Sequence, residues 1–133
     1  MQFINLHTHS YSAQPEILEV VNQYPWEFSS EIPQYSIGIH PWYIEENRLK
    51  SDLRVIEEKL QEKKCLALGE CGLDKRIEIP LSVQTKVFQQ QIELVQKTTK
   101  PIILHCVAAY QEVIAIQKEM NIQNPMIIHG FSK

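Results

Sequence analysis

The sequence predicts an α/β fold built on a parallel sheet, and two observations support that prediction. Short apolar runs alternate along the chain with longer segments in which apolar residues recur every three or four positions. The runs at 102–104 and 126–128 are apolar without interruption, which is typical of strands covered on both faces. Strands that alternate with helices in this way indicate parallel strands joined by crossover helices.

Each short apolar run is interpreted as one strand. The first begins almost at the N-terminus, and the second is a weaker candidate. The predicted strands cover residues 3–6, 17–21, 35–39, 65–69, 101–104 and 125–128.

Three helices are predicted between the later strands. Ser51 suits the start of a helix because a serine hydroxyl accepts a hydrogen bond from a free backbone N–H there, so the first helix should run from Ser51 to about residue 63. The second should begin at Ser82 and end near residue 98, and the third should cover 108–120. Their inward faces are apolar and comprise Leu53, Ile56 and Leu60, then Val87, Phe88, Ile92 and Val95, and then Val113, Ile116 and Met120.

Composition limits the class of protein. A length of 133 residues predicts one domain over 1–133, and 44% hydrophobic with 22% charged residues is an ordinary globular balance. A net charge of -3 gives no long-range attraction for nucleic acid, so a polyanionic substrate would need metals or local positive charge. Three cysteines without a CxxC pair predict a reduced, cytoplasmic compartment. We expect neither a signal peptide nor a membrane span.

Polar residues stand directly after five of the apolar runs. They are His7, His40, Glu70, His105 and His129. In a parallel α/β barrel the carboxyl ends of the strands converge on one mouth, where catalytic groups lie, whereas an open sheet would spread them along a line. The pattern therefore favours a (β/α) barrel of the TIM type, incomplete, with about six of its eight strands present.

These residue types are those of a metal site. His7 and His9 are two apart, which places both side chains on one face of a strand, and neutral imidazole binds zinc, manganese and iron. Glu70 stands between Gly69 and Gly72, and a carboxylate can bridge two cations. Each signal alone has an ordinary alternative, a surface histidine or a solvated loop. Their repetition at strand ends makes the metal site the better interpretation.

Other residues near these motifs have both a functional and an ordinary interpretation. His40 could be a metal ligand, a phosphate contact or a general acid, or it could be a structural residue. Lys75 and Arg76 could contact a phosphate backbone or be an ordinary solvated pair. The aromatic residues Trp26, Trp42 and Tyr43 could stack bases or pack. A cysteine nucleophile at Cys71 or Cys106 is the weaker hypothesis.

Together these stretches resemble the TatD family of metal-dependent deoxyribonucleases, which are amidohydrolase-like α/β barrels. The stretches are LHTH at 6–9, GIHP at 38–41, LGECGLD at 68–74, PIILH at 101–105 and IHGFS at 128–132. The resemblance implies that His7 and His9 hold one divalent metal, that Glu70 bridges to a second, and that His105 and His129 hold the second. It places His40 beside the substrate phosphate.

The activity implied is hydrolysis of a phosphodiester, with nucleotides released from a DNA 3′ end. Two metals roughly 3.5–4 Å apart would activate water and neutralise charge on the phosphate. Zinc, manganese, magnesium and iron are the candidate ions, with magnesium the least suited to histidine ligands. Catalysis would rest on Glu70 and His40, and substrate binding on His40, Lys75 and Arg76.

The sequence departs from the family in its last part. The family's final strand carries an Asp ligand and base, and neither Asp52 nor Asp74 is expected in that role. Val107 stands where an Arg is frequent, and Lys133 where a glycine is common. The chain therefore reads as C-terminally truncated, and an exposed sheet edge predicts an oligomer or a missing C-terminal segment that completes the barrel. Alternative functions are a phosphoesterase of the polymerase-and-histidinol-phosphatase type, an inactive metal-binding fragment, or an interaction module.

Overall fold

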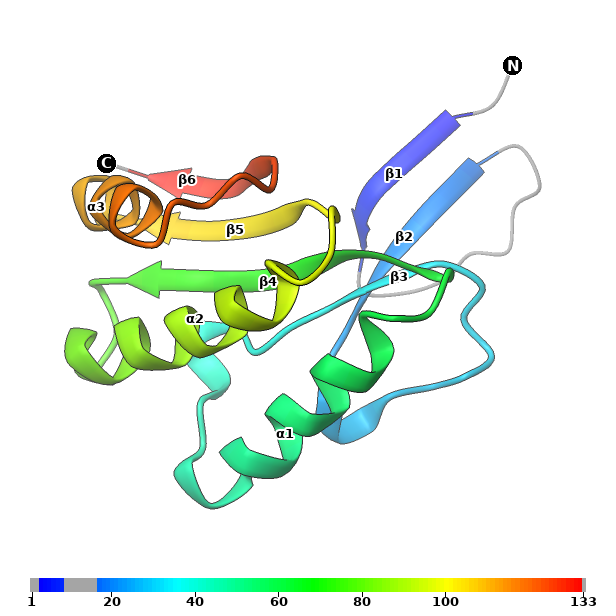
Figure 1. Ribbon diagram of the computed structural model, residues 1–133, viewed down its shortest axis with the longest axis horizontal. Coiled ribbons are helices and arrows are strands. Elements are labelled where there is room, and N and C mark those ends of the chain that lie inside the picture. Colours follow the sequence, from blue (N-terminus) through cyan, green and yellow to red (C-terminus); the bar gives the residue numbers. More distant parts are fainter. Residues whose placement is uncertain (1–2, 9–16, 133) are drawn as a thin grey trace.

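The structure is a computed structural model that describes the backbone of residues 3–8 and 17–132 and the side chains of residues 20–129. Its six strands form one parallel sheet in the order β1-β2-β3-β4-β5-β6 (Figure 1). The strands are β1 (Phe3–Thr8), β2 (Ile17–Gln23), β3 (Tyr35–Ile37), β4 (Cys65–Asp74), β5 (Ile102–Val107) and β6 (Met126–Ser132). Spatial order thus follows chain order, as in a barrel rather than in a doubly wound open sheet.

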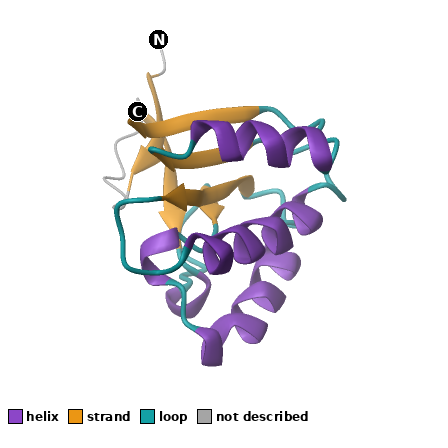
Figure 2. Cartoon of the chain, turned by 90° about the vertical axis from the view of Figure 1, so that its left-hand side faces the viewer, coloured by secondary structure: helices purple, strands orange, loops and turns teal. Residues whose placement is uncertain are grey.

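Three α-helices connect the later strands. They are α1 (Glu46–Lys59), α2 (Leu81–Val95) and α3 (Tyr110–Glu119). Figures 1 and 2 show α1 and α2 side by side against the sheet. Between β2 and β3 the described chain forms only a 3-10 turn, η1 (Pro25–Glu27), and a second, η2 (Pro41–Tyr43), follows β3. The predicted strand–helix alternation is therefore confirmed from β3 onward.

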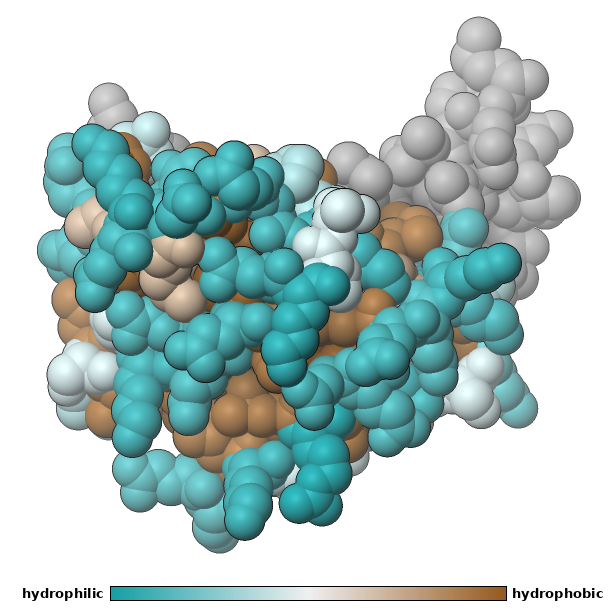
Figure 3. Space-filling view, in the orientation of Figure 1, coloured by the Kyte–Doolittle hydropathy of each residue, from teal (hydrophilic) through white to brown (hydrophobic). Residues whose placement is uncertain are grey.

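The core fills the space between these helices and the sheet. Ile56 of α1, Leu60 directly after that helix, and Phe88 and Ile92 of α2 are almost completely buried, together with Leu68 of β4. These helix residues were predicted to face inward. The outer surfaces of α1 and α2 are mostly hydrophilic, with apolar residues visible between them (Figure 3). No helix in the described part of the chain is long and apolar enough to cross a membrane.

The first helix begins earlier than predicted. Ser51 is not its cap but lies inside α1, where its hydroxyl donates to the carbonyl of Arg48 at 3.0 Å. A serine can bond to the preceding turn in this way and remain helical, so its presence does not mark a helix start. Asp52 follows it, is buried, and pairs with Arg48 at 2.9 Å.

Strand β4 continues five residues past its predicted end at residue 69, and its glycines explain this. Gly69 and Gly72 have φ angles of 141° and 145°, which other residues rarely adopt. A Cβ on either would collide with a backbone carbonyl of β5, at Ile103 and at His105. The two backbones therefore approach closely, and pairing persists through a register shift between Gly69 and Cys71. Glu70 consequently lies within β4 rather than beyond it.

Candidate metal centre

Three side chains from adjacent strands converge at the carboxyl end of the sheet. His40 follows β3, Glu70 lies on β4 and His105 on β5, and all three are buried. One ligand atom from each lies within 4.8 Å of the others. Nδ1 of His105 is 3.0 Å from Oε2 of Glu70, and Nε2 of His40 is 3.9 Å from Oε1. Two imidazoles around one carboxylate can hold a divalent cation.

Asp74 completes this group, although the sequence did not indicate its role. Its Oδ2 lies 3.0 Å from Nε2 of His105, on the opposite side of the ring from Glu70. Register explains the arrangement, because His105 pairs with Gly72, midway between Glu70 and Asp74 on the same strand. Four residues apart on a strand, the two carboxylates share a face. The four-residue spacing of Glu70 and Asp74 could have indicated this arrangement. It did not, because the predicted strand ended at residue 69 and so contained neither residue.

The two carboxylates around His105 favour positive charge at this position. Burial alone would lower the pKa of His105, but its contacts with Glu70 and Asp74 outweigh that effect and raise its pKa above the ordinary value. A neutral imidazole has one N–H and cannot donate to both carboxylates. A cation between Nδ1 and Glu70 would resolve this, with Nε2–H donating to Asp74. A ligating histidine with a carboxylate on its other nitrogen is a recurrent metal-site arrangement, so the donor set fits a divalent metal.

Trp42 connects Asp74 to His40. Its indole Nε1–H donates to Oδ2 of Asp74 at 2.8 Å, and its backbone N–H donates to Nδ1 of His40 at 3.1 Å. Burial would raise the pKa of Asp74, but the hydrogen bonds from Trp42 and His105 lower it below the usual value. Because Nδ1 of His40 accepts, a neutral His40 carries its proton on Nε2, which faces Glu70. That N–H is oriented toward the site.

Buried amide side chains fix the backbone around these groups. The N–H of Glu70 donates to Oδ1 of Asn22 at 2.6 Å. Gln84 of α2 accepts from the N–H of Asp74 at 2.8 Å and donates to its carbonyl at 3.0 Å. Gln91 forms the same pair of bonds with Ile39, just before His40, at 2.8 and 3.3 Å. Helix α2 thereby positions two residues of the site through backbone contacts.

His129 lies at the edge of the same group. It pairs in register with His105, is exposed, and lines a pocket of about 260 Å³. The residues around this pocket are Tyr24, His40, Trp42, Tyr43, Glu70, His105 and His129. Four of the predicted site residues therefore share one pocket.

The remaining predicted site residues are placed only in part. The backbone of His7 lies on β1, but its side chain is outside the described part of the structure, as is the whole of His9. Lys75 pairs with Glu112 of α3 at 2.5 Å, and neither Lys75 nor Arg76 is among the residues that line the pocket. Their contact with substrate stays a prediction.

The cysteines do not form a nucleophilic site. Cys65, Cys71 and Cys106 are free and buried. Burial raises the pKa of the Cys71 thiol, and that of Cys106, above the ordinary value. A buried thiol that stays protonated is a poor nucleophile, which agrees with the preference for metal chemistry.

Comparison with known proteins identifies the family to which this arrangement belongs. All of the chain, residues 1–133, matches the model of the family described as TatD related DNase. The protein is a member of that family. The resemblance inferred from the five motifs is thus confirmed.

Individual relatives agree with the family. An uncharacterized metal-dependent hydrolase, YabD of Bacillus subtilis, is 32% identical over 77% of this chain and 38% of its own length. A 3′-5′ ssDNA/RNA exonuclease, TatD of Pantoea ananatis, is 31% identical over 71% of this chain and 37% of its own length. The chain therefore spans little more than a third of these two relatives.

A solved structure shows the same fold. The TatD homologue YjjV of Escherichia coli superposes with a TM-score of 0.80 at 20% identity, over 98% of this chain and 61% of that one. The predicted α/β barrel with six of its strands is confirmed by this match together with the observed sheet.

Proposed function

We propose that the protein is a metal-dependent phosphodiester hydrolase that removes nucleotides from the 3′ end of single-stranded DNA. The observation that supports this most directly is the shared pocket of His40, Glu70 and His105, with Asp74 behind His105. Relatives described as a 3′-5′ RNA nuclease, from Homo sapiens, and as a 3′-5′ ssDNA/RNA exonuclease point to the same class of substrate. We propose a reduced, cytoplasmic setting, given three free cysteines.

Two divalent ions are proposed, with zinc, manganese, magnesium or iron as candidates. His7 and His9 would hold one, His105 and His129 the other, and Glu70 would bridge them. When bound, such ions neutralise charge on a phosphate and lower the pKa of water. This assignment uses every histidine that follows a predicted strand except His40.

His40 has a separate proposed role. Its Nε2–H faces the pocket while Trp42 fixes Nδ1, so it can donate to a phosphate oxygen or to the departing oxygen. Asp74 would keep His105 in the tautomer whose Nδ1 lone pair faces the metal. Lys75 and Arg76, which directly follow β4, would contact the backbone of a longer substrate.

One group is still to be assigned. The family's final aspartate has no counterpart among the described residues that line this pocket, and Asp74 lies behind His105 rather than among the clustered ligand atoms. We propose that a second copy of the chain, or a segment beyond those present, supplies it. The single domain over 1–133 is then one part of a complete barrel.

The decisive experiment incubates the chain with 3′-labelled single-stranded DNA and manganese or magnesium, with EDTA as control. Metal-dependent release of mononucleotides supports the proposal, and Glu70→Gln should abolish it. The matched variant Glu57→Gln changes a carboxylate on the exposed side of α1 and should leave turnover unchanged. Hydrolysis of p-nitrophenyl phosphate without action on DNA would instead indicate a phosphomonoesterase. Metal binding with no turnover of either substrate would indicate a metal-binding module.

A further inference from the structure

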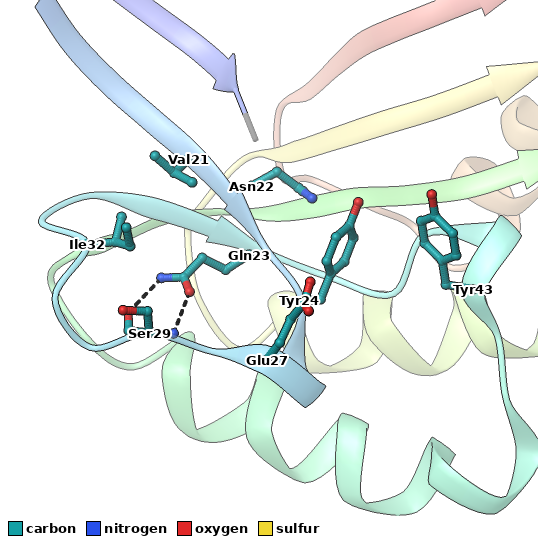
Figure 4. Close-up of a pocket in the computed structure, with 8 residues that line it drawn as sticks. All are labelled: Val21, Asn22, Gln23, Tyr24, Glu27, Ser29, Ile32 and Tyr43. Atoms are coloured by element: carbon teal, nitrogen blue, oxygen red, sulfur yellow. Dashed lines mark hydrogen bonds between the residues drawn. The ribbon is translucent and has the colours of Figure 1, made fainter. Parts of the chain in front are cut away.

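A second hollow adjoins the metal pocket. It has a volume of about 470 Å³ and lies at the carboxyl end of β2, with Asn22, Tyr24 and Tyr43 among its lining residues (Figure 4). Tyr24 and Tyr43 also line the metal pocket. The two hollows therefore share these two aromatic rings as part of their walls. We call the second hollow the side pocket.

Asn22 offers the side pocket a hydrogen-bond donor. Only 4% of this residue is exposed, and its Oδ1 is already used by the N–H of Glu70 and, at 3.5 Å, by the hydroxyl of Ser36. Its Nδ2 is buried and has no partner within hydrogen-bond geometry among the described residues, although the amide lies close enough to the Tyr24 hydroxyl to lower the pKa of that group. Figure 4 shows this nitrogen on the side toward Tyr24, whose hydroxyl points the same way as that of Tyr43. Buried donors without partners are rare and unfavourable, and a ligand acceptor would satisfy this one.

The remaining lining indicates the kind of ligand. Aromatic rings form one wall, Glu27 adds a carboxylate, and no Lys or Arg is among the described lining residues. A free phosphate would meet no positive charge here. A sugar and base fit better, since a base has flat apolar faces and acceptor atoms, and a sugar hydroxyl can donate to a carboxylate. The volume is within the usual range for small-molecule sites.

We propose that the side pocket binds the nucleoside part of the terminal nucleotide while its phosphate lies in the metal pocket, and that Asn22 Nδ2 donates to an acceptor on that nucleoside. This rests on the proposed function and extends it to the recognition of the leaving nucleotide. Asn22 thus has two roles, because the same amide group fixes the backbone of Glu70. The Asn22 amide that would recognise the nucleoside therefore also accepts a hydrogen bond from the backbone of Glu70, the proposed metal ligand.

Tyr24 is suited to assist. Burial, followed by the nearby Tyr43, Glu70 and Glu27, raises the pKa of Tyr24 to about 12 against a lowering contribution from the Asn22 side chain, so its hydroxyl stays protonated at neutral pH. Tyr24 also stacks on Trp26 with ring centroids 4.9 Å apart and planes 7° from parallel. Trp26 in turn packs under the guanidinium of Arg48 at 3.9 Å. The ring is therefore held in place before a ligand arrives.

The test compares the affinities of three probes for the manganese-loaded chain by titration calorimetry. The probes are deoxyadenosine 5′-monophosphate, deoxyribose 5-phosphate and inorganic phosphate. We expect the nucleotide to bind about tenfold or more tightly than the sugar phosphate, as one good hydrogen bond and base stacking would provide. Equal affinity for the nucleotide and the sugar phosphate would overturn the proposal.

Two variants locate the preference. Ser29→Trp places a large ring in the side pocket but not in the metal pocket, and should remove the preference while inorganic phosphate binds as before. Ser29→Ala is its matched control and should retain the preference. Asn22→Asp keeps the acceptor for Glu70 and loses the donor. Its added charge affects all three probes, so the ratio of nucleotide to sugar phosphate is the quantity that should fall. A preference that survives Ser29→Trp in a folded protein would place the nucleoside elsewhere.

The outcomes separate this inference from the proposed function. Release of nucleotides from DNA without any preference for the nucleotide over the sugar phosphate would leave the function standing and remove the side-pocket role. A preference that Ser29→Trp abolishes, in a chain that cleaves no nucleic acid, would support the side pocket and contradict the proposed reaction. Failure of all three probes to bind would overturn the side-pocket role, and the release of nucleotides from DNA would then decide the proposed function separately.

Discussion

At the scale of single residues, the site depends on how His105 is held between two acids. Glu70 and Asp74 lie on opposite sides of its ring, each 3.0 Å from a ring nitrogen. Trp42 keeps Asp74 in place from the other direction. Asp74 should therefore act on the metal through His105, by fixing the ring and its tautomer.

Asp74→Asn should weaken metal binding by about tenfold or more, because loss of a carboxylate behind a ligating histidine typically has an effect of that size. Titration calorimetry with zinc or manganese measures it. Asp52→Asn is the matched control, since Asp52 is equally buried but pairs with Arg48 on α1. Its metal affinity should equal that of the wild type. Equal losses in the two variants would mean that Asp74 acts only on overall stability.

The metal-free protein should lose stability as pH rises. The folded-state pKa of His105 lies above its ordinary value, so its contribution is fully present below about pH 6.5 and disappears as pH rises through the folded-state pKa. Urea unfolding at several pH values in EDTA would show the decline. His105→Gln should flatten that part of the curve, and an unchanged slope in this variant would contradict the assignment.

Substitutions of the proposed metal ligands should differ in how many ions the protein loses. Glu70→Ala should abolish binding of both metals, because Glu70 is proposed to bridge them, whereas His129→Ala should weaken one site and spare the other. Metal stoichiometry, measured by equilibrium dialysis and elemental analysis, separates the two results. Two ions still bound to Glu70→Ala would exclude the bridging role.

At the scale of secondary-structure elements, α2 positions the site more than its sequence indicates. Gln84 and Gln91 project from its buried face and bond the backbones of Asp74 and Ile39. Gln23 does the same for Ser29 beside the side pocket, at 2.7 and 3.0 Å. Each glutamine side chain thus accepts a hydrogen bond from the backbone N–H of one residue and donates one to its carbonyl, as an adjacent strand would.

Gln84→Met should lower the free energy of unfolding by about 1–3 kcal/mol, because it leaves buried backbone groups without partners. Gln90→Met on the same helix is a suitable control, since the buried Oε1 of Gln90 has no partner among the described residues. Gln90→Met should lower the free energy of unfolding much less than Gln84→Met does. Urea unfolding followed by circular dichroism compares the two, and equal losses would argue against the backbone contacts as the cause.

Much of this element-level arrangement could be predicted, and the misses have physical causes. His40, Glu70 and His105 were predicted together because parallel strands end at one edge. Asp74 was missed because two glycines let β4 continue beyond its apolar run. Asn22 was missed because the apolar pattern predicts a strand that ends at residue 21, whereas β2 continues to Gln23. Polar contacts across the sheet depend on register, which an apolar pattern in one strand does not specify.

At the scale of the whole molecule, β6 is the last strand in the order of the described sheet. Ile127 and Ile128 on this strand are 37% and 44% exposed. An edge strand with exposed apolar side chains favours pairing with another chain. This agrees with the proposal that a second copy or a further segment completes the barrel.

The chain should therefore self-associate at micromolar concentrations. Ile128→Lys should shift it toward the monomer, because a charge on an edge strand opposes pairing. Sedimentation velocity would measure the change, with Glu119→Lys on α3 as a control that should not alter the distribution. A wild-type chain that sediments only as a monomer would contradict this prediction.

The position of each ligand in the sheet also determines how the centre responds to local opening. Glu70 and His105 lie on β4 and β5, which have neighbours on both sides, whereas His7 and His129 lie on the outermost described strands. Outer strands fray at lower free energy than inner ones, and their amide protons exchange sooner with solvent. A transient opening of β1 or β6 would therefore release His7 or His129, each proposed to hold a different ion, while the proposed bridging carboxylate of Glu70 stayed folded. The two metals would leave and enter one at a time, by way of a half-loaded protein with its central strands intact.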